Sequence, residues 1–437
     1  MNTKSKNVLI QGGRVMDPAS GFDAIADLTI VNGAVASIGP IPDGFQAQER
    51  IDASGLLVLP GLVDLAVRLR EPGNEHARML ESEMNAAMAG GITSLVCQPD
   101  TDPVLDESGL VEMLRFRAEK LKQARVYPLG ALTRGLQGEA LTEMLQLSDA
   151  GCVAFSQAEE AIVNTQVLQR ALQYASTFGF AVWLRPQDAY LGKGVAASGP
   201  LATRMGLSGV PVMAETIAMH TLFELMRSTG ARVHLCRISS AAGVELVRQA
   251  KAQGLALTCD VSINSLHLTD HDIAYFDSSA RLNPPLRQQR DREALRAGLL
   301  DGTIDALVSD HTPVDDDAKM VPFAESEPGA TGLELLLSLA YKWHLDDATP
   351  LARALAAVTQ GPAQVMGAAL GSRQGRTGRL IEGGLADICI FDPNAAWVVR
   401  PEALRSQGNF TPFSGYELPG RVRYTLVGGR LAYQATI

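Results

Sequence analysis

The side chains best suited to catalysis or binding lie where short apolar segments of the sequence end. Most are basic or amide groups, namely Arg68, Gln157, Arg185 and Arg237, and one is an acid, Asp310. A guanidinium group stays protonated and has no acceptor, so it repels a divalent cation and pairs with carboxylates. A glutamine amide is a poor zinc ligand, and Asp310 alone cannot hold the ion, because zinc needs several N, O or S donors. The pattern predicts buried ion pairs and argues against metal-dependent hydrolysis, in which the ion must acidify a water molecule.

The elements that must position these groups alternate between strands and helices along the middle of the chain. The spacing predicts eight strands, at 62–68, 93–98, 124–129, 152–156, 180–185, 232–238, 256–262 and 304–309. Helical patterns separate most of them, for example at 75–89, 107–121, 214–228, 241–253 and 291–300. This alternation is typical of βαβ units and favours an α/β fold with a (β/α)8 barrel of the TIM type over residues 59–364. The arginines and Asp310 would then meet at the barrel mouth, because the carboxyl ends of parallel strands share one edge.

Both ends of the chain are β-rich. Residues 1–58 and 365–437 carry short apolar runs divided by turn signals such as Asp17-Pro18 and Asn32-Gly33. Because the two segments flank the long alternating part, we expect them to combine into one small β-sandwich beside the barrel.

Composition limits the class of protein. The 437 residues include 38 basic and 48 acidic side chains, for a net charge of −10, and 46% are hydrophobic. An acidic chain without Lys/Arg-rich runs argues against nucleic-acid binding. We expect no membrane association, because the sequence lacks a signal-peptide pattern and an apolar run of the ~18 residues that a membrane helix needs. Five dispersed cysteines predict reduced thiols in a soluble cytoplasmic protein.

Several longer motifs resemble the dihydroorotases of the cyclic amidohydrolase family. PGLVDLAVRLREPG (60–73) is similar to the family signature PGLIDxHVHxREPG, and GGITSLVCQPDTDPVLD (90–106) to GGFTTVxxMPNTxP. VHLCRISSAAGVELV (233–247), ARLNPPLR (280–287) and DGTIDALVSDHTP (301–313) resemble HICHLS, KVNPPLR and DGTIDxIxTDHAPH. The match spans nearly the whole chain, and the bacterial type I dihydroorotases are the most similar group. The resemblance implies an amidohydrolase barrel.

The resemblance is weakest at the metal ligands. In the family these positions hold the two histidines of an HxH pair, an aspartate, two further histidines and a second aspartate, in that order. The corresponding residues of this chain are Ala66, Arg68, Gln157, Arg185, Arg237 and Asp310. We therefore expect no bound zinc, no other cofactor and no catalytic residue, with Asp310 a vestigial general acid/base.

The exchange at these positions has an electrostatic consequence. It raises the formal charge of the mouth by four, which equals the charge of two zinc ions. We therefore expect Arg68, Arg185 and Arg237 to take over the electrostatic role of the metals and to pair with Asp310 and with Asp64. Bidentate arginine–carboxylate contacts offset the penalty of burying these charges.

The family's substrate-binding positions are only partly kept. Arg70, which in the family binds the dihydroorotate carboxylate, and Asn283 are present. The asparagine of the family's MPNT segment corresponds to Asp100, which would repel a carboxylate. His311 follows Asp310 and should face away from the barrel axis, where we expect it to make a structural hydrogen bond.

The resemblance implies a role in pyrimidine biosynthesis. We expect a catalytically inactive dihydroorotase-like chain, a homodimer that docks onto the catalytic subunit of aspartate transcarbamoylase and supports its assembly. One alternative is an active dihydroorotase or related cyclic amidohydrolase with an atypical metal site. Another is a non-catalytic binder of an anionic metabolite at the arginine-lined mouth.

Overall fold

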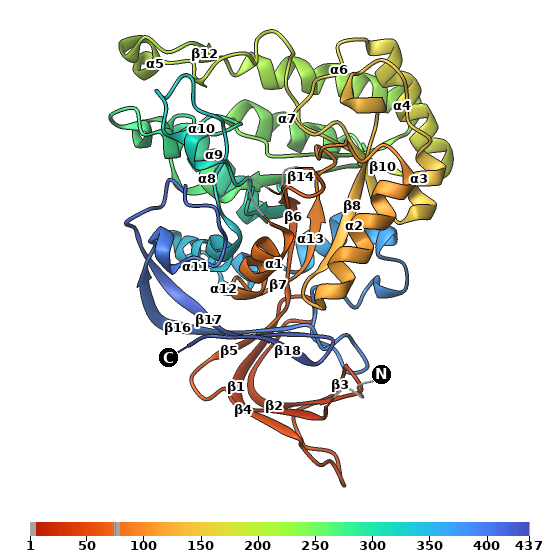
Figure 1. Cartoon of the computed structure of the whole chain (residues 1–437), viewed down its shortest axis with the longest axis vertical. Helices are drawn as coiled ribbons and strands as arrows, with labels where there is room; N and C mark the ends of the chain where they lie inside the picture. The colour runs from red at the N-terminus through yellow and green to blue at the C-terminus, as the bar shows by residue number, and fades with distance from the viewer. Residues whose placement is uncertain (1–5, 74, 76–78, 437) are drawn as a thin grey trace.

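A computed structural model describes residues 6–73, 75 and 79–436. Figure 1 shows a barrel ringed by helices and, beside it, a curved sheet to which both ends of the chain contribute. Within the described residues, no helix is long and apolar enough to cross a membrane. The five cysteines are all buried and unpaired, as the sequence predicts.

The barrel consists of eight parallel strands in sequential order, and all eight predicted strands are confirmed. They are β6 (Leu62–Val67), β7 (Ile92–Cys97), β8 (Arg125–Ala131), β9 (Ala154–Ser156), β10 (Ala181–Leu184), β13 (Arg232–Leu235), β14 (Leu257–Ser262) and β15 (Ala306–Val308). A bridge between Val67 and His311 brings the last strand end back to the first, so the barrel is nearly closed. The (β/α)8 architecture predicted from the alternating pattern is therefore present.

Helices cover the outside of the barrel. They include α1 (Leu80–Ala89), α2 (Ser108–Leu121), α3 (Met144–Ala150), α4 (Thr165–Phe178), α6 (Met213–Thr229), α7 (Ala241–Ala252), α9 (Gln289–Asp301) and α11 (Leu336–Asp347). Local signals set their ends: Asn164 caps α4 through its side chain, and Gly179 ends it with φ +70°. The helix predicted over 75–89 begins only at Leu80, because Met79 has an extended backbone; residues 76–78 lie outside the described residues.

Shorter elements complete the barrel region. They are α5 (Pro200–Met205), α8 (Ile263–His267), α10 (Asp316–Lys319), α12 (Leu351–Ala356), α13 (Gln360–Met366), β11 (Ala196–Ala197) and β12 (Gly209–Val210). Met366 of α13 and Leu370, just after it, pack into the barrel interior against residues such as Val63 and Trp183. The barrel core therefore extends to Leu370, beyond the boundary at 364 that the sequence suggests.

The terminal segments form one mixed eight-stranded sheet in place of the two facing sheets that a sandwich implies. Its strands are β1 (Val8–Asp17), β2 (Phe22–Val31), β3 (Ala34–Ile38), β4 (Glu49–Asp52), β5 (Leu57–Pro60), β16 (Ile388–Val398), β17 (Glu417–Val427) and β18 (Arg430–Gln434). Strand β5 joins the two ends of the chain, because it pairs with β1 on one side and with β16 on the other. Val8, Ile30, Ile388 and Leu426 belong to a separate apolar core of this sheet.

A buried carboxylate ties the barrel to the C-terminal segment. Glu83 of α1 accepts hydrogen bonds from His311 Nε2 (2.7 Å) and Ser406 Oγ (2.7 Å), and the Glu83 and His311 side chains are both fully buried. The His311 Nδ1 accepts from the backbone N–H of Gly332 (3.2 Å). This confirms the structural hydrogen bond expected of His311.

Replacing Glu83 with glutamine should lower the free energy of unfolding by about 2–3 kcal/mol, because a neutral amide would replace the charged oxygen that accepts both hydrogen bonds in a dry site. Urea unfolding would measure the change. The matched control is Glu112→Gln on exposed α2 surface, which should change stability by no more than about 0.5 kcal/mol. Equal effects of the two variants would contradict a specific role for this contact.

Candidate functional site

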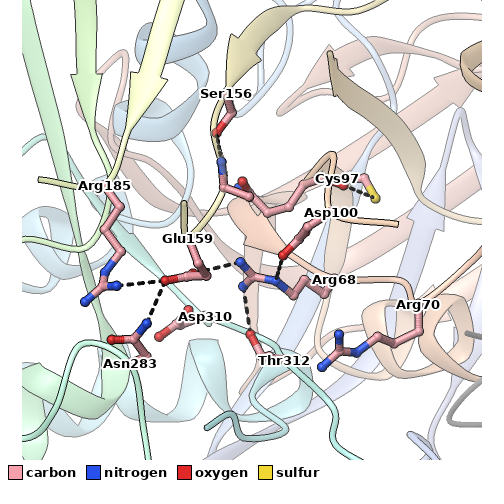
Figure 2. Close-up of polar contacts among 12 residues, drawn as sticks. Arg68, Arg70, Cys97, Asp100, Ser156, Glu159, Arg185, Asn283, Asp310 and Thr312 are labelled. Atoms are coloured by element: carbon pink, nitrogen blue, oxygen red, sulfur yellow. Dashed lines mark hydrogen bonds and ion pairs between the residues drawn. The ribbon is translucent and has the colours of Figure 1, made fainter. Parts of the chain in front are cut away.

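A cluster of ion pairs fills the mouth of the barrel. It consists of Arg68, Arg185, Arg237, Glu159, Asp310, Asp100 and Asn283, which are called the mouth cluster below. Figure 2 shows Glu159 at its centre, with Arg185 and Arg68 approaching from opposite sides and Asn283 from below. Each of the seven residues follows a different strand of the barrel, as expected for the carboxyl-terminal face.

Glu159, in the loop after β9, receives hydrogen bonds from four side chains. Its Oε1 atom accepts from Arg68 Nη2 (2.8 Å) and Arg237 Nη2 (2.5 Å). Its Oε2 atom accepts from Arg185 Nη1 (2.9 Å) and Asn283 Nδ2 (2.9 Å). The carboxylate therefore uses both oxygens to hold three guanidinium groups together.

The outer contacts of the cluster involve further guanidinium nitrogens of Arg237 and Arg68. Arg237 Nη1 donates to Asp310 Oδ1 (3.0 Å). Arg68 donates through Nε to Asp100 Oδ2 (2.7 Å) and through Nη1 to Thr312 Oγ1 (3.0 Å). Asp100 was expected to repel an anionic substrate; in the structure it neutralises an arginine.

The cluster balances its own charge. Three guanidinium groups face three carboxylates, those of Glu159, Asp310 and Asp100, and the arginine side chains are only 4–6% exposed. Burial raises the pKa of Glu159, but the guanidinium groups of Arg237, Arg185 and Arg68 outweigh this and hold its pKa well below the usual range. Burial raises the pKa of Asp310, and Arg237 and Arg68 offset this only in part. The ionised form of Glu159 is thus the main counterion.

Two of the former ligand positions point elsewhere. Ala66 is buried in the apolar barrel interior. Gln157 turns away from the cluster: its Nε2 donates to the carbonyl of Leu136 (2.7 Å), and its Oε1 accepts from Thr133 Oγ1 (3.0 Å). Neither side chain contributes to the mouth cluster.

Asp64 and Arg70 also differ from expectation. The expected pairing of Asp64 with an arginine is wrong: its Oδ1 accepts from the backbone N–H groups of Ala66 (3.3 Å) and Ser309 (3.2 Å), deep in the barrel. Arg70 stands apart from Glu159 (Figure 2), donates to the carbonyl of Pro313 (2.8 Å) and pairs with Glu327 (3.4 Å). Of the three substrate-like positions, only Asp100 and Asn283 join the cluster.

The residues at the mouth do not fit a metal. Arg68, Arg185 and Arg237 place three positive charges where a cation would have to sit, and guanidinium offers no lone pair. The carboxylate oxygens of Glu159 are already bonded to these groups and to Asn283. Zinc binding would require the ion to compete with fixed positive charges at contact distance, so these side chains do not form a zinc site.

A different group in the described part of the chain has metal-ligand composition. His234, Cys236 and Asp260 place one potential ligand atom each within 4.8 Å of one another. The His234 ring is already bonded, through Nε2 to Asp260 Oδ2 (2.9 Å) and through Nδ1 to Thr258 Oγ1 (2.9 Å). Burial raises the pKa of the Cys236 thiol well above its usual range, which disfavours the thiolate. These contacts support a structural role beneath the cluster.

Several residues at the mouth have an unusual, left-handed backbone conformation. Arg70, Ala158, Arg237 and Asp310 adopt left-handed conformations with φ between +51° and +59°. Such residues are strained by about 1–2 kcal/mol each when they are not glycine, and they concentrate at active sites and ligand clamps. The backbone of the mouth thus has conformations that are common at active sites, whereas its side chains form ion pairs.

Sequence reasoning missed Glu159, the central residue. The expected excess of four positive charges required counterions, and Glu159-Glu160 stands two residues beyond Gln157. That pair of acids was the available signal. The family resemblance points to the ligand position at Gln157 and not to the acids that follow it.

Comparisons with known proteins show the family to which the chain belongs. The Dihydro-orotase-like family matches residues 55–242, and the Amidohydrolase family matches residues 207–432. A dihydroorotase-like protein of Pseudomonas aeruginosa is 45% identical over 98% of this chain and 99% of its own length. A dihydroorotase of Citrifermentans bemidjiense is 39% identical over 98% of this chain and its own full length.

Among solved structures, the L-hydantoinase of Arthrobacter aurescens superimposes with a TM-score of 0.86, covering 98% of this chain and 96% of that one. Its identity is 23%, so this likeness concerns the fold. The barrel and the near full-length similarity together show that the chain belongs to the dihydroorotase-like proteins of the amidohydrolase family.

Proposed function

We propose that this chain is a non-catalytic dihydroorotase homologue that acts in pyrimidine biosynthesis as an assembly subunit for aspartate transcarbamoylase. The observation that carries the proposal is the closed set of ion pairs around Glu159, where an amidohydrolase would hold its metals. A homodimer in the cytoplasm, docked on the transcarbamoylase catalytic subunit, is the arrangement that the family resemblance suggests.

The chemistry of the mouth supports the non-catalytic part of the proposal. Hydrolysis of a cyclic amide needs an activated water and a group that polarises the carbonyl. Asp310 is the one former ligand that is kept, and it is bonded to Arg237. Two cavities reach the cluster arginines, with volumes of about 10 and 170 Å³. Both are smaller than the roughly 300–1,000 Å³ typical of small-molecule sites.

What the fold retains supports the assembly role. The barrel and the terminal sheet are complete, and the ion pairs stabilise the mouth in place of metals. A protein that must present a surface needs this scaffold and does not need the reaction. Its 45% identical relative in Pseudomonas aeruginosa is likewise described as dihydroorotase-like.

The proposed lack of catalytic activity is tested on the purified chain. We expect zinc far below one ion per chain by elemental analysis, and no dihydroorotate turnover with or without added zinc. A dihydroorotase of the same family, assayed in parallel, is the positive control. Near-stoichiometric zinc with turnover that Asp310→Asn abolishes would establish the active-hydrolase alternative instead.

The assembly part is tested by co-expression with the aspartate transcarbamoylase catalytic chain of the same organism. We expect co-purification, a larger particle by light scattering, and transcarbamoylase activity at least several-fold above that of the catalytic chain alone. Asp310→Asn should preserve the effect, because the role does not use the carboxyl group as an acid. Transcarbamoylase that assembles and works equally well alone would overturn the proposal.

A further inference from the structure

A large cavity lies at the end of the barrel opposite the mouth. Its volume is about 1170 Å³, and it is bounded by the start of β8, the end of α2, the segment after α13 and the turn between β17 and β18. Because the mouth is at the carboxyl ends of the strands, the start of β8 places this cavity at the other end, against the terminal sheet (Figure 1). It is called the basal cavity below.

The basal cavity is strongly basic within an acidic protein. Its lining contains six basic residues and two acidic ones, whereas the whole chain carries a net charge of −10. The charged lining residues are Lys6, Arg115, Lys122, Arg125, Arg373, Arg430, Glu49 and Glu119. A concave surface of one sign focuses the electrostatic field and attracts ligands of the opposite sign.

Some of these cations are already neutralised. Arg125 pairs with Asp387, Lys6 with Glu49 (3.5 Å) and Arg115 with Glu119 (3.7 Å). These pairs account for the two acidic lining residues and one acid beside the cavity.

Three further cations carry the excess charge. Within the described residues, the side chains of Arg373 and Lys122 have no ion pair or hydrogen bond, and Arg430 donates to the backbone carbonyl of Lys122. The charge of Arg373 reaches Tyr127 on the cavity wall. Burial raises the pKa of Tyr127, and the positive charges of Arg373 and Arg125 oppose that shift. The mouth cluster shows the contrast, because there every guanidinium group has a carboxylate partner.

Much of the remaining wall is apolar. Val126, Tyr127, Leu370 and Leu431 lie along the cavity beside the basic side chains. We propose that the basal cavity binds a nucleotide-sized organic phosphate, with its phosphate groups on Arg373, Lys122 and Arg430 and its less polar part against Tyr127 and Leu370. Guanidinium groups suit this ligand, because their fork of donors matches phosphate oxygens. The inference does not depend on the proposed assembly function.

Isothermal titration calorimetry with ATP, UTP and inorganic triphosphate tests the proposal on the full chain. We expect one site per chain for at least one nucleotide, tighter than for triphosphate, with affinity that falls as salt rises. Arg373→Glu and Lys122→Glu should each weaken binding at least tenfold, since each replaces an attraction with a repulsion. Both residues are exposed and unpaired, so the variants should keep the wild-type melting temperature.

Arg204→Glu, on exposed α5 at the far end of the molecule, is the matched control and should change the affinity less than twofold. No binding of any of the three probes would overturn the proposal. So would equal effects of Arg204→Glu and Arg373→Glu, which would mark non-specific attraction. Triphosphate that binds as tightly as the nucleotides would overturn the nucleotide-sized assignment.

Discussion

Replacing Glu159 with glutamine is expected to destabilise the protein by about 3 kcal/mol, because it leaves three buried guanidinium groups without their shared counterion. The Arg68, Arg185 and Arg237 side chains are 4–6% exposed, so water cannot take over the role of the carboxylate. Glutamine keeps the shape but turns an NH2 group toward donors. Glu159 itself is 28% exposed, which places the expected loss at the low end of the range for a broken buried pair.

Urea unfolding with circular dichroism would measure this loss. Glu160→Gln is the matched control, since Glu160 is the exposed neighbour on the same loop and should change stability by less than about 0.5 kcal/mol. Arg185→Met, alone and with Glu159→Gln, completes a double-mutant cycle. We expect a coupling of about 2 kcal/mol between Glu159 and Arg185. Additive effects of the two substitutions would show that the cluster does not hold together through Glu159.

The barrel could be predicted from the sequence because its signals are local. Each strand is a short apolar run, each intervening helix has its own periodic face, and the order of the motifs fixes the sequence of strands. The mixed terminal sheet was harder to predict from the sequence, because β5 pairs with both β1 and β16. These two strands are separated by almost the whole chain. Apolar runs at the two ends indicate strands but not the partners of those strands.

The arginines of the mouth could be predicted for the same reason. Arg68, Arg185 and Arg237 lie within two residues of the ends of barrel strands, so the fold alone brings their side chains together. Glu159 lies in a loop whose direction changes at Ala158, which has φ +51°. A left-handed residue of this type is decided by tertiary contacts and breaks the alternation of side-chain directions that strand residues obey. The role of Glu159 as the counterion could therefore be recognised only from the three-dimensional structure.

The pKa of Asp64 is shifted in the opposite direction from that of Glu159. It is fully buried at the barrel core, and within the described residues its Oδ2 atom has no hydrogen-bond partner. Burial raises its pKa to about 7, and hydrogen bonds from Ser309 and Ala66 lower it only in part. The folded protein therefore holds a proton on Asp64 at pH values where the unfolded chain has released it.

This difference predicts that stability falls as pH rises. Below an ordinary aspartate pKa near 4, both states bind the proton and Asp64 contributes no pH dependence. Between about pH 4 and 7 only the folded state binds it, so the free energy of unfolding decreases with pH, and above 7 the loss is complete. The shift corresponds to at most about 4 kcal/mol, and relaxation around the ionised group should reduce the loss to about 2–3 kcal/mol.

Asp64→Asn removes the titration and keeps the shape of the side chain. At pH 8 the variant should be more stable than the wild type by about 2–3 kcal/mol, and at pH 4 the two should agree within about 1 kcal/mol. Urea midpoints at several pH values would measure both. Glu334, whose pKa burial also raises to about 7, should leave a smaller slope of the same sign in the variant. An unchanged slope in Asp64→Asn would mean that Asp64 is not the carboxyl group responsible, and that the barrel core tolerates its ionised form.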